Sequence, residues 1–294
     1  MAGRLARMGS PIYEGLTRPS KAGDVWTGKV EVSNWGQVIK PLAWRRPRRI
    51  FVNSMSDLFH PALPDTVRDQ VFAVMALCPR HTFQVLTKRP DVMRRYVVER
   101  HSRNEVELAA EPIRRGIEAL GGKHMFPWPL PNVWLGVSVE DQARANERIP
   151  DLLATHAAVR FISAEPLLGR VNFVPWATPE TDLIADGQGF VVRHRLPGIS
   201  WCIVGGESGP GARPMRREWA EHLLDQCEAL NVRAFFKQTG SNRGPDWPSG
   251  ITGKGNDPAQ WPWRFRVQHF PETAPARKAD VCPADLFAEA SHAR

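Results

Sequence analysis

Six short runs of apolar, β-prone residues recur along the chain, and each ends abruptly at a small group of polar residues. With their polar endings, the runs read IFVNSMSD, FQVLTKRP, VWLGVSVED, VRFISAEP, WCIVGGESG and RAFFKQTG. Continuous apolar runs of this length are typical of strands buried on both faces of a sheet, and helical periodicity follows most of them. The pattern therefore predicts parallel βα repeats.

These repeats predict an α/β fold, a partial or complete (β/α) barrel. The first strong strand is predicted at residues 50–53, and Pro64 introduces the helix after it. Three regions divide the chain: an irregular and helical segment at 1–49, a barrel core at 50–240 and a loop-rich tail at 241–294. Insertions are expected at about 100–130 and at 171–198, the second of which reads as a β-hairpin. The last residues, 271–294, are expected to be poorly ordered.

The polar endings predict a functional site, because the carboxyl ends of parallel barrel strands share one rim. One such ending alone is explained equally well by a helix N-cap or a turn, notably at Ser56, Asp57 and Asp141. Six endings together favour a site. Its candidate residues are Asn53, Ser54, Ser56, Asp57, Thr87, Lys88, Arg89, Ser138, Glu140, Ser163, Glu165, Gly205, Gly206, Glu207, Ser208, Lys237 and Gln238.

Two carboxylates and two lysines stand out among these candidates. Glu165 and Glu207 would end neighbouring or near-neighbouring strands, with Lys88 and Lys237 across the same rim. Burial and opposite charges could shift pKa values for general acid–base chemistry, or the charges could neutralise one another as a structural ion network. The sequence leaves both alternatives open.

The glycine-rich ending Gly205-Gly206-Glu207-Ser208-Gly209 also allows two interpretations. Its amides could approach a phosphate, a sugar or an adenine edge, since glycine permits close backbone approach. It could equally be a tight turn in which Glu207 caps the backbone. The later glycine-rich stretch at 250–255 lacks the spacing of a phosphate-binding loop and is interpreted as a flexible loop.

The charge of the chain indicates either an anionic partner such as nucleic acid or a solvated basic surface. The 294 residues carry a formal charge of +8, and the isoelectric point is about 9.7. The excess is strongest in a tract that contains Arg45, Arg46, Arg48 and Arg49. No apolar run reaches the roughly 18 residues of a membrane span. We therefore expect a cytoplasmic protein without membrane insertion.

The four cysteines are scattered, at Cys78, Cys202, Cys227 and Cys282. Their spacing argues against a zinc ribbon or a disulfide framework. Ordinary packing in the core is the favoured interpretation, because a buried free thiol behaves as a small apolar group.

Several runs resemble, one after another, the phage Gp-thirty-seven/Gp-sixty-eight family of uncharacterised phage and bacterial proteins. The matching runs are FVNSMSDLFHPALPD, FQVLTKRPDVMRRY, PNVWLGVSVEDQ, VRFISAEPLLG and IVGGESGPGARPM, within residues 12–238. Members of that family look like radical SAM enzymes. The resemblance implies S-adenosylmethionine (SAM) and a four-iron four-sulfur cluster as cofactors.

The family's cluster loop carries three cysteines and ends in Cys-x-x-Cys-Tyr-Ala, after a first strand. Here Met1-Ala2-Gly3-Arg4 stands just past the place of that loop. The favoured expectation is that the first strand and the cysteines lie upstream of a start codon assigned too late. The alternative is a member that has lost the cluster.

The resemblance also implies roles for the rim residues. Asn53, Ser54 and Ser56 would lie near the SAM amino group, Ser163 and Glu165 near the ribose, and Gly205, Gly206 and Glu207 near adenine. Ser138 joins these cofactor-binding candidates. Glu165, Glu207, Lys88 and Lys237 are the catalytic candidates, and Arg89 and Gln238 face the substrate.

The favoured function is a radical SAM-like enzyme of unknown substrate, for which the basic charge suggests nucleic acid or a nucleotide. The alternative is a noncatalytic nucleic-acid-binding or partner protein that uses the barrel as a scaffold. A third possibility is a metal-free barrel hydrolase or lyase that uses Glu165, Glu207 and Lys88.

Overall fold

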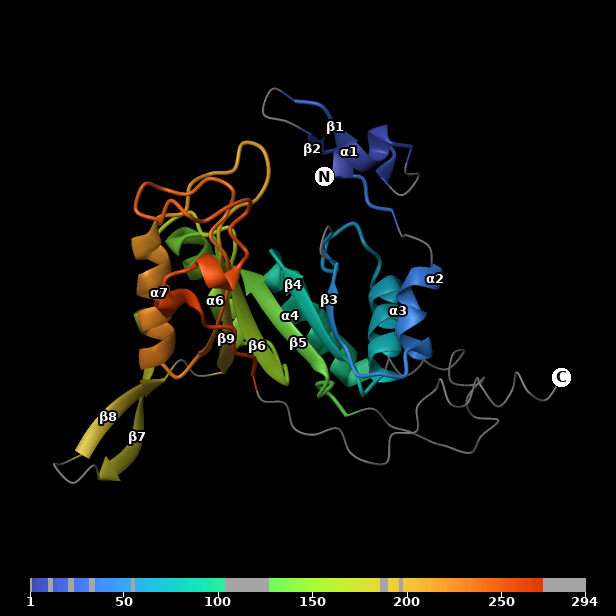
Figure 1. Cartoon of the computed structure of the whole chain (residues 1–294). Coiled ribbons are helices and arrows are strands. Elements are labelled where there is room, and N and C mark those ends of the chain that lie inside the picture. Colours follow the sequence, from blue (N-terminus) through green and yellow to red (C-terminus); the bar gives the residue numbers. More distant parts are fainter. Residues whose placement is uncertain are drawn as a thin grey trace.

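Six parallel strands form a sheet that curls into a half-barrel (Figure 1). The computed structural model describes residues 2–9, 13–20, 24–31, 35–53, 56–103, 127–185, 190–195 and 198–271. The strands lie in the order in which they occur along the chain: β3 (Arg49–Val52), β4 (Thr82–Thr87), β5 (Val133–Ser138), β6 (Val159–Ala164), β9 (Ile199–Gly205) and β10 (Arg233–Gln238). All six predicted strands are present, and the predicted partial barrel is confirmed as a half-barrel. The expected further strand, preceding β3, remains a prediction.

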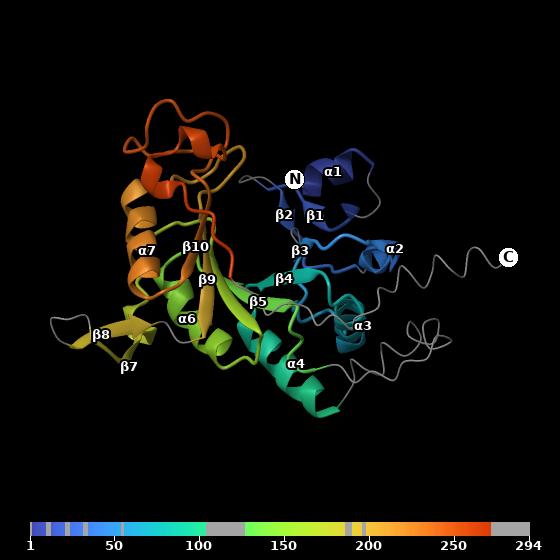
Figure 2. The same ribbon diagram turned by 60° about the horizontal axis from the view of Figure 1, so that its bottom comes forward.

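Helices cover one face of this sheet (Figure 2). They are α3 (Asp65–Ala76), α4 (Pro90–Arg103), α6 (Gln142–Leu153) and α7 (Arg217–Ala229). Pro64 directly precedes α3, as predicted, and its own backbone is extended. Asp141 begins α6, where its carboxylate accepts a hydrogen bond from the Arg144 amide at 2.8 Å. For Asp141, the capping interpretation is therefore confirmed.

The alternation of side chains along the strands gives the two faces of the sheet different cores. Toward the helices, Val85, Val137 and Ile162 belong to the large apolar core. On the opposite face, a smaller core contains Trp134, Val159, Phe161, Trp201 and Ile203, with Leu86, Phe235 and Phe270 packed against it. We call this second face the inner face.

Gly136 on β5 makes room for the aromatic packing of the inner face. It is the strand partner of Phe161 on β6. A Cβ atom at position 136 would lie 2.5 Å from the Phe161 ring, well inside van der Waals contact. The missing side chain therefore allows Phe161 to lie across β5.

The segment before the barrel consists of short elements. It contains α1 (Ala2–Arg7), a two-residue antiparallel pair of β1 (Thr17–Arg18) and β2 (Val25–Trp26), α2 (Trp35–Val38) and a 3-10 turn, η2 (Lys40–Ala43). None of these elements joins the six-stranded sheet.

The expected hairpin is present within the predicted insertion at 171–198. After the 3-10 turn η3 (Val174–Trp176), β7 (Thr178–Ala185) pairs antiparallel with β8 (Phe190–Arg195). Of the other insertion, residues 100–103, which end α4, and residues 127–130 are described, and residues 104–126 lie outside the described ranges.

The first part of the C-terminal tail packs onto β10. This segment includes η4 (Pro258–Gln260) and η5 (Trp263–Phe265). The rings of Trp261 and Phe265 both lie 4.9 Å from that of Phe236. Sequence reasoning treated the tail as loops and missed this packing. The expected disorder at 271–294 concerns residues that, apart from Pro271, lie outside the described ranges.

The tail then reaches the inner face and contacts the opposite edge of the sheet. The His269 amide donates to the Ala234 carbonyl at 2.9 Å. Next to it, the Phe270 ring lies 5.2 Å from Trp201, and the Arg49 guanidinium lies 3.9 Å from the Phe270 ring centre. Arg49 begins β3, so this cation–π contact links the first strand of the half-barrel to the segment beside its last strand.

No helix in the described ranges combines the length and apolar character needed to span a bilayer.

We predict that Gly136→Ala destabilises the fold by about 1–3 kcal/mol, because the new methyl group must displace the Phe161 ring. Urea unfolding would measure the change. Gly250→Ala is the matched control, since a Cβ atom there meets nothing within 4 Å. Equal stability of the two variants would contradict the packing described for the inner face.

Candidate functional site

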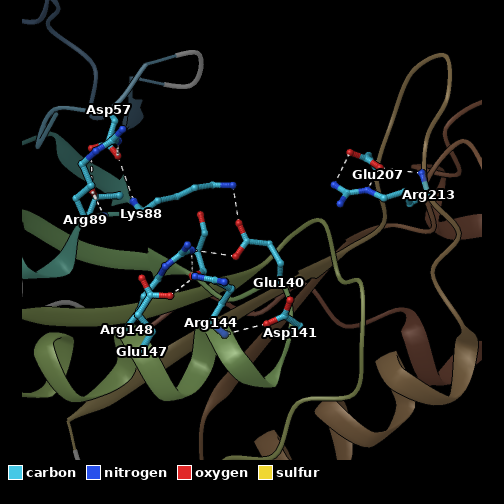
Figure 3. Close-up of polar contacts among 12 residues, drawn as sticks. Asp57, Lys88, Arg89, Glu140, Asp141, Arg144, Glu147, Arg148, Glu207 and Arg213 are labelled. Atoms are coloured by element: carbon cyan, nitrogen blue, oxygen red, sulfur yellow. Dashed lines mark hydrogen bonds and ion pairs between the residues drawn. The ribbon is translucent and has the colours of Figure 1, made fainter. Parts of the chain in front are cut away.

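The carboxyl ends of the strands carry four carboxylates, each paired with at least one cation. Figure 3 shows three of them, Asp57, Glu140 and Glu207. The carboxylates are Asp57, Glu140, Glu165 and Glu207, and their partners are Arg89, Lys88, Arg148, Lys237 and Arg213. We call this set of residues the charged rim.

Asp57, in the loop after β3, binds the end of β4. One carboxylate oxygen accepts hydrogen bonds from the Thr87 hydroxyl at 2.7 Å and from the Phe59 amide at 2.9 Å. The other accepts from the Arg89 guanidinium at 2.6 Å and from the Lys88 amide at 3.2 Å. Asp57 therefore does more than cap a turn, because it fixes the polar end of the neighbouring strand.

Glu140, just after β5, forms the most buried ion pair of the rim. Arg148 on α6 donates to one of its oxygens at 2.9 Å, and both side chains are about nine-tenths buried. The Lys88 ammonium approaches the other oxygen at 2.5 Å. Lys88 thus bridges two groups of the rim, since its amide binds Asp57 and its side chain binds Glu140 (Figure 3).

Glu165, just after β6, faces the end of β10. The Lys237 ammonium lies 2.8 Å from one carboxylate oxygen, and the Gln238 amide nitrogen lies 3.1 Å from the other. Gly205 makes room for this carboxylate, because a Cβ atom at position 205 would lie 3.3 Å from it. The structure therefore brings together four of the predicted site residues, from the ends of three strands, β6, β9 and β10.

Glu207 is held by Arg213 from the same loop. The guanidinium donates to both carboxylate oxygens at 2.9 Å, and the Arg213 amide adds a third bond at 2.7 Å. These hydrogen bonds lower the pKa of Glu207 below its ordinary value of 4.5 and raise the pKa of Arg213. Glu207 is therefore a fixed anion near neutral pH.

The glycine-rich loop before Arg213 uses its backbone internally. The Gly206 amide donates to the Gln238 carbonyl at 2.9 Å, and a Cβ atom at position 206 would overlap the Thr239 carbonyl. Gly206 thus allows two loops to cross closely, as the tight-turn alternative expects. Its amide is occupied within the chain.

The predicted serines and Asn53 fall into two places. Ser138 and Ser163 are buried strand partners on β5 and β6. Asn53 and Ser56 follow β3, where Asn53 has a positive φ of 60° and its carbonyl accepts a hydrogen bond from the Ser56 amide at 3.2 Å. Ser54 lies outside the described ranges.

The described residues do not fit an iron–sulfur cluster. Cys78, Cys202 and Cys227 are buried in the apolar core, as the packing interpretation predicted. In the part of the chain that the structure describes, no three His, Cys, Asp or Glu side chains gather as a metal-binding group. Cys282 lies outside the described ranges.

Sequence reasoning missed two arginines of the rim, Arg148 and Arg213. Arg148 lies on α6 between residues that face the core, and an arginine there signals a buried carboxylate partner. Arg213 follows the glycine-rich loop, and only the path of that loop shows that it turns back to Glu207. The pairing of every rim carboxylate is what the ion-network alternative expects.

Residues 1–269 match the model of a family described as "Protein of unknown function (DUF5131)". No curated protein and no solved structure matches the chain. The family match covers most of the chain. This match does not connect the chain to the phage family or to the radical SAM enzymes that the motifs of the chain resemble.

We predict that the Arg213–Glu207 pair contributes stability that depends on pH. Glu207 has a lowered pKa in the folded protein, so its contribution is present above pH 4.5 and is lost as the pH falls through its lowered pKa. Arg213→Gln should cost about 0.2–1 kcal/mol near neutral pH, a small effect because the Arg213 side chain is 59% exposed.

Urea unfolding at a series of pH values measures this difference. It should shrink toward zero in acid, and it should be absent at every pH when Arg213→Gln is made in a Glu207→Gln background. A cost that stays constant with pH, or that persists in that background, would rule out the pairing as its cause.

Proposed function

The chain belongs to this family of unknown function, and from that premise we propose that the strand ends at the charged rim, on the inner face of the half-barrel, bind SAM, as in a radical SAM-like enzyme. One observation carries the SAM-binding part. Strands β5, β6 and β10 place Ser138, Ser163, Glu165 and Lys237 together above an apolar floor.

The polar groups suit the hydrogen-bonding groups of SAM. Each oxygen of Glu165 accepts one bond from the protein, and a carboxylate oxygen has a further lone pair for a ribose hydroxyl or an amine. The Lys237 side chain is half exposed, so its ammonium can also meet the carboxylate of the ligand.

The floor below suits the adenine ring. Ile203 is the strand partner of Ser163 on one side and of Phe235 on the other. The Ile203 and Phe235 side chains pack in the small aromatic core of the inner face, directly beneath the polar groups. We propose that the adenine ring, which is flat and largely apolar with polar edges, lies over this core.

The radical part of the proposal rests on the resemblance alone. An iron–sulfur cluster would supply the electron that cleaves SAM, and it needs cysteine ligands that the described residues do not provide. We therefore derive no step through a cluster, and the described residues are assigned only to binding and orienting SAM.

We predict that the protein binds SAM in isothermal titration calorimetry and that Glu165→Gln weakens binding about tenfold. The substitution keeps the shape of the side chain and removes its charge, and hydrogen bonds to charged groups contribute about 1.5–3 kcal/mol. Glu218→Gln is the matched control, because Glu218 is an exposed carboxylate on α7. Failure to bind SAM, or equal weakening by both substitutions, would refute the binding site.

The radical part has its own test. The reading frame upstream of Met1 is translated, and the extended protein is reconstituted with iron and sulfide without oxygen. With SAM and a reductant it should produce deoxyadenosine. A stop codon before any cysteine triplet, or the absence of that product, would remove the radical chemistry and leave SAM binding to be judged by calorimetry.

A further inference from the structure

The two ends of the half-barrel differ in whether carboxylates neutralise their basic side chains. At the charged rim, every basic partner named above lies within 3 Å of a carboxylate. At the amino ends of β3 and β4, four arginines form no ion pair with any carboxylate of the described ranges. They are Arg46, Arg48, Arg49 and Arg80, which we call the arginine corner.

Backbone contacts hold these arginines at one place. The Thr82 amide, at the start of β4, donates to the Arg48 carbonyl at 2.9 Å. The Arg48 amide donates to the His81 imidazole at 3.2 Å. Burial lowers the pKa of His81, and the nearby charges of Arg80 and Arg48 act in the same direction. The tract before β3 and the turn before β4 therefore combine their charges.

Aromatic rings fix the orientation of two of the guanidinium groups. Arg48 lies over the Trp44 ring at 4.4 Å, and Arg49 lies over the Phe270 ring at 3.9 Å. A stacked guanidinium keeps its N–H groups available in its own plane, where they match the oxygens of a phosphate. Arg46, Arg48 and Arg49 are all exposed.

Arg80 adds a partly buried guanidinium beside these groups. Its Nε and one terminal nitrogen are enclosed by the chain, and neither has a hydrogen-bond partner among the described residues. The exposed guanidinium groups of Arg46, Arg48 and Arg49 are therefore the ones that an outside ligand can reach.

We propose that the arginine corner binds the phosphate backbone of a nucleic acid. Residues 45–49 are exposed in succession and four of the five are arginines, a density suited to a chain of phosphates. The excess of eight positive charges acts in the same direction, because the cations of the rim are already neutralised. Phosphate contacts carry no sequence information, so binding is independent of sequence. This binding does not depend on SAM.

The test measures fluorescence anisotropy of a labelled single-stranded DNA of mixed sequence over a range of salt concentrations. The double variant Arg46→Gln/Arg48→Gln should lose roughly three- to tenfold in affinity. The slope of log K against log salt should fall by about 0.7 for each phosphate contact removed. Parallel titrations with duplex DNA and RNA identify which nucleic acid binds best.

The matched control is Arg144→Gln/Arg216→Gln, which removes the same charge from exposed sites on α6 and beside α7. It should bind DNA as the unaltered protein does. Unfolding midpoints of both double variants exclude loss of the fold as the cause.

Three results would overturn the proposal. The first is equal weakening by both double variants, which would indicate net charge alone. The second is an unchanged salt slope in the corner variant. The third is an absence of nucleic-acid binding, including the case in which polyglutamate or vesicles of anionic lipid bind in its place.

Discussion

Parallel pairing of six successive strands is the constraint on which the rest of this structure depends. Because neighbouring strands run in the same direction, polar residues that follow separate apolar runs meet at one end of the sheet. Glu165 and Lys237 are 72 positions apart in the chain, yet their charged atoms lie 2.8 Å apart. The same pairing brings the arginine tract before β3 beside the turn before β4 at the other end.

The distribution of charge along the half-barrel follows from this arrangement. At the charged rim, carboxylates and cations neutralise one another. The rim therefore presents polar groups in fixed orientations, and its net electrostatic field is weak. At the arginine corner, aromatic rings orient guanidinium groups that have no carboxylate partner among the described residues. A small polar ligand suits the first end, and a polyanion suits the second.

The sequence predicted the strands, their parallel arrangement and the end of the sheet that carries the polar groups, because apolar runs and the residues that end them are local signals. It could not predict the Glu140–Arg148 pair, which depends on how α6 is rotated against β5. The crossing at Gly206 and the packing of Trp261 on Phe236 are contacts between distant segments, and no local pattern specifies them. The iron–sulfur loop was inferred from resemblance and has no counterpart among the described residues.

Amide chemical shifts during titration of the isotopically labelled protein with SAM test the central claim most directly. The account predicts shifts that saturate and that concentrate after β5, β6, β9 and β10, at Ser138, Ser163, Glu165, Gly205 and Lys237. No shifts, or shifts confined to the arginine corner or to the helices, would contradict the assignment of the binding site to the strand ends at the charged rim.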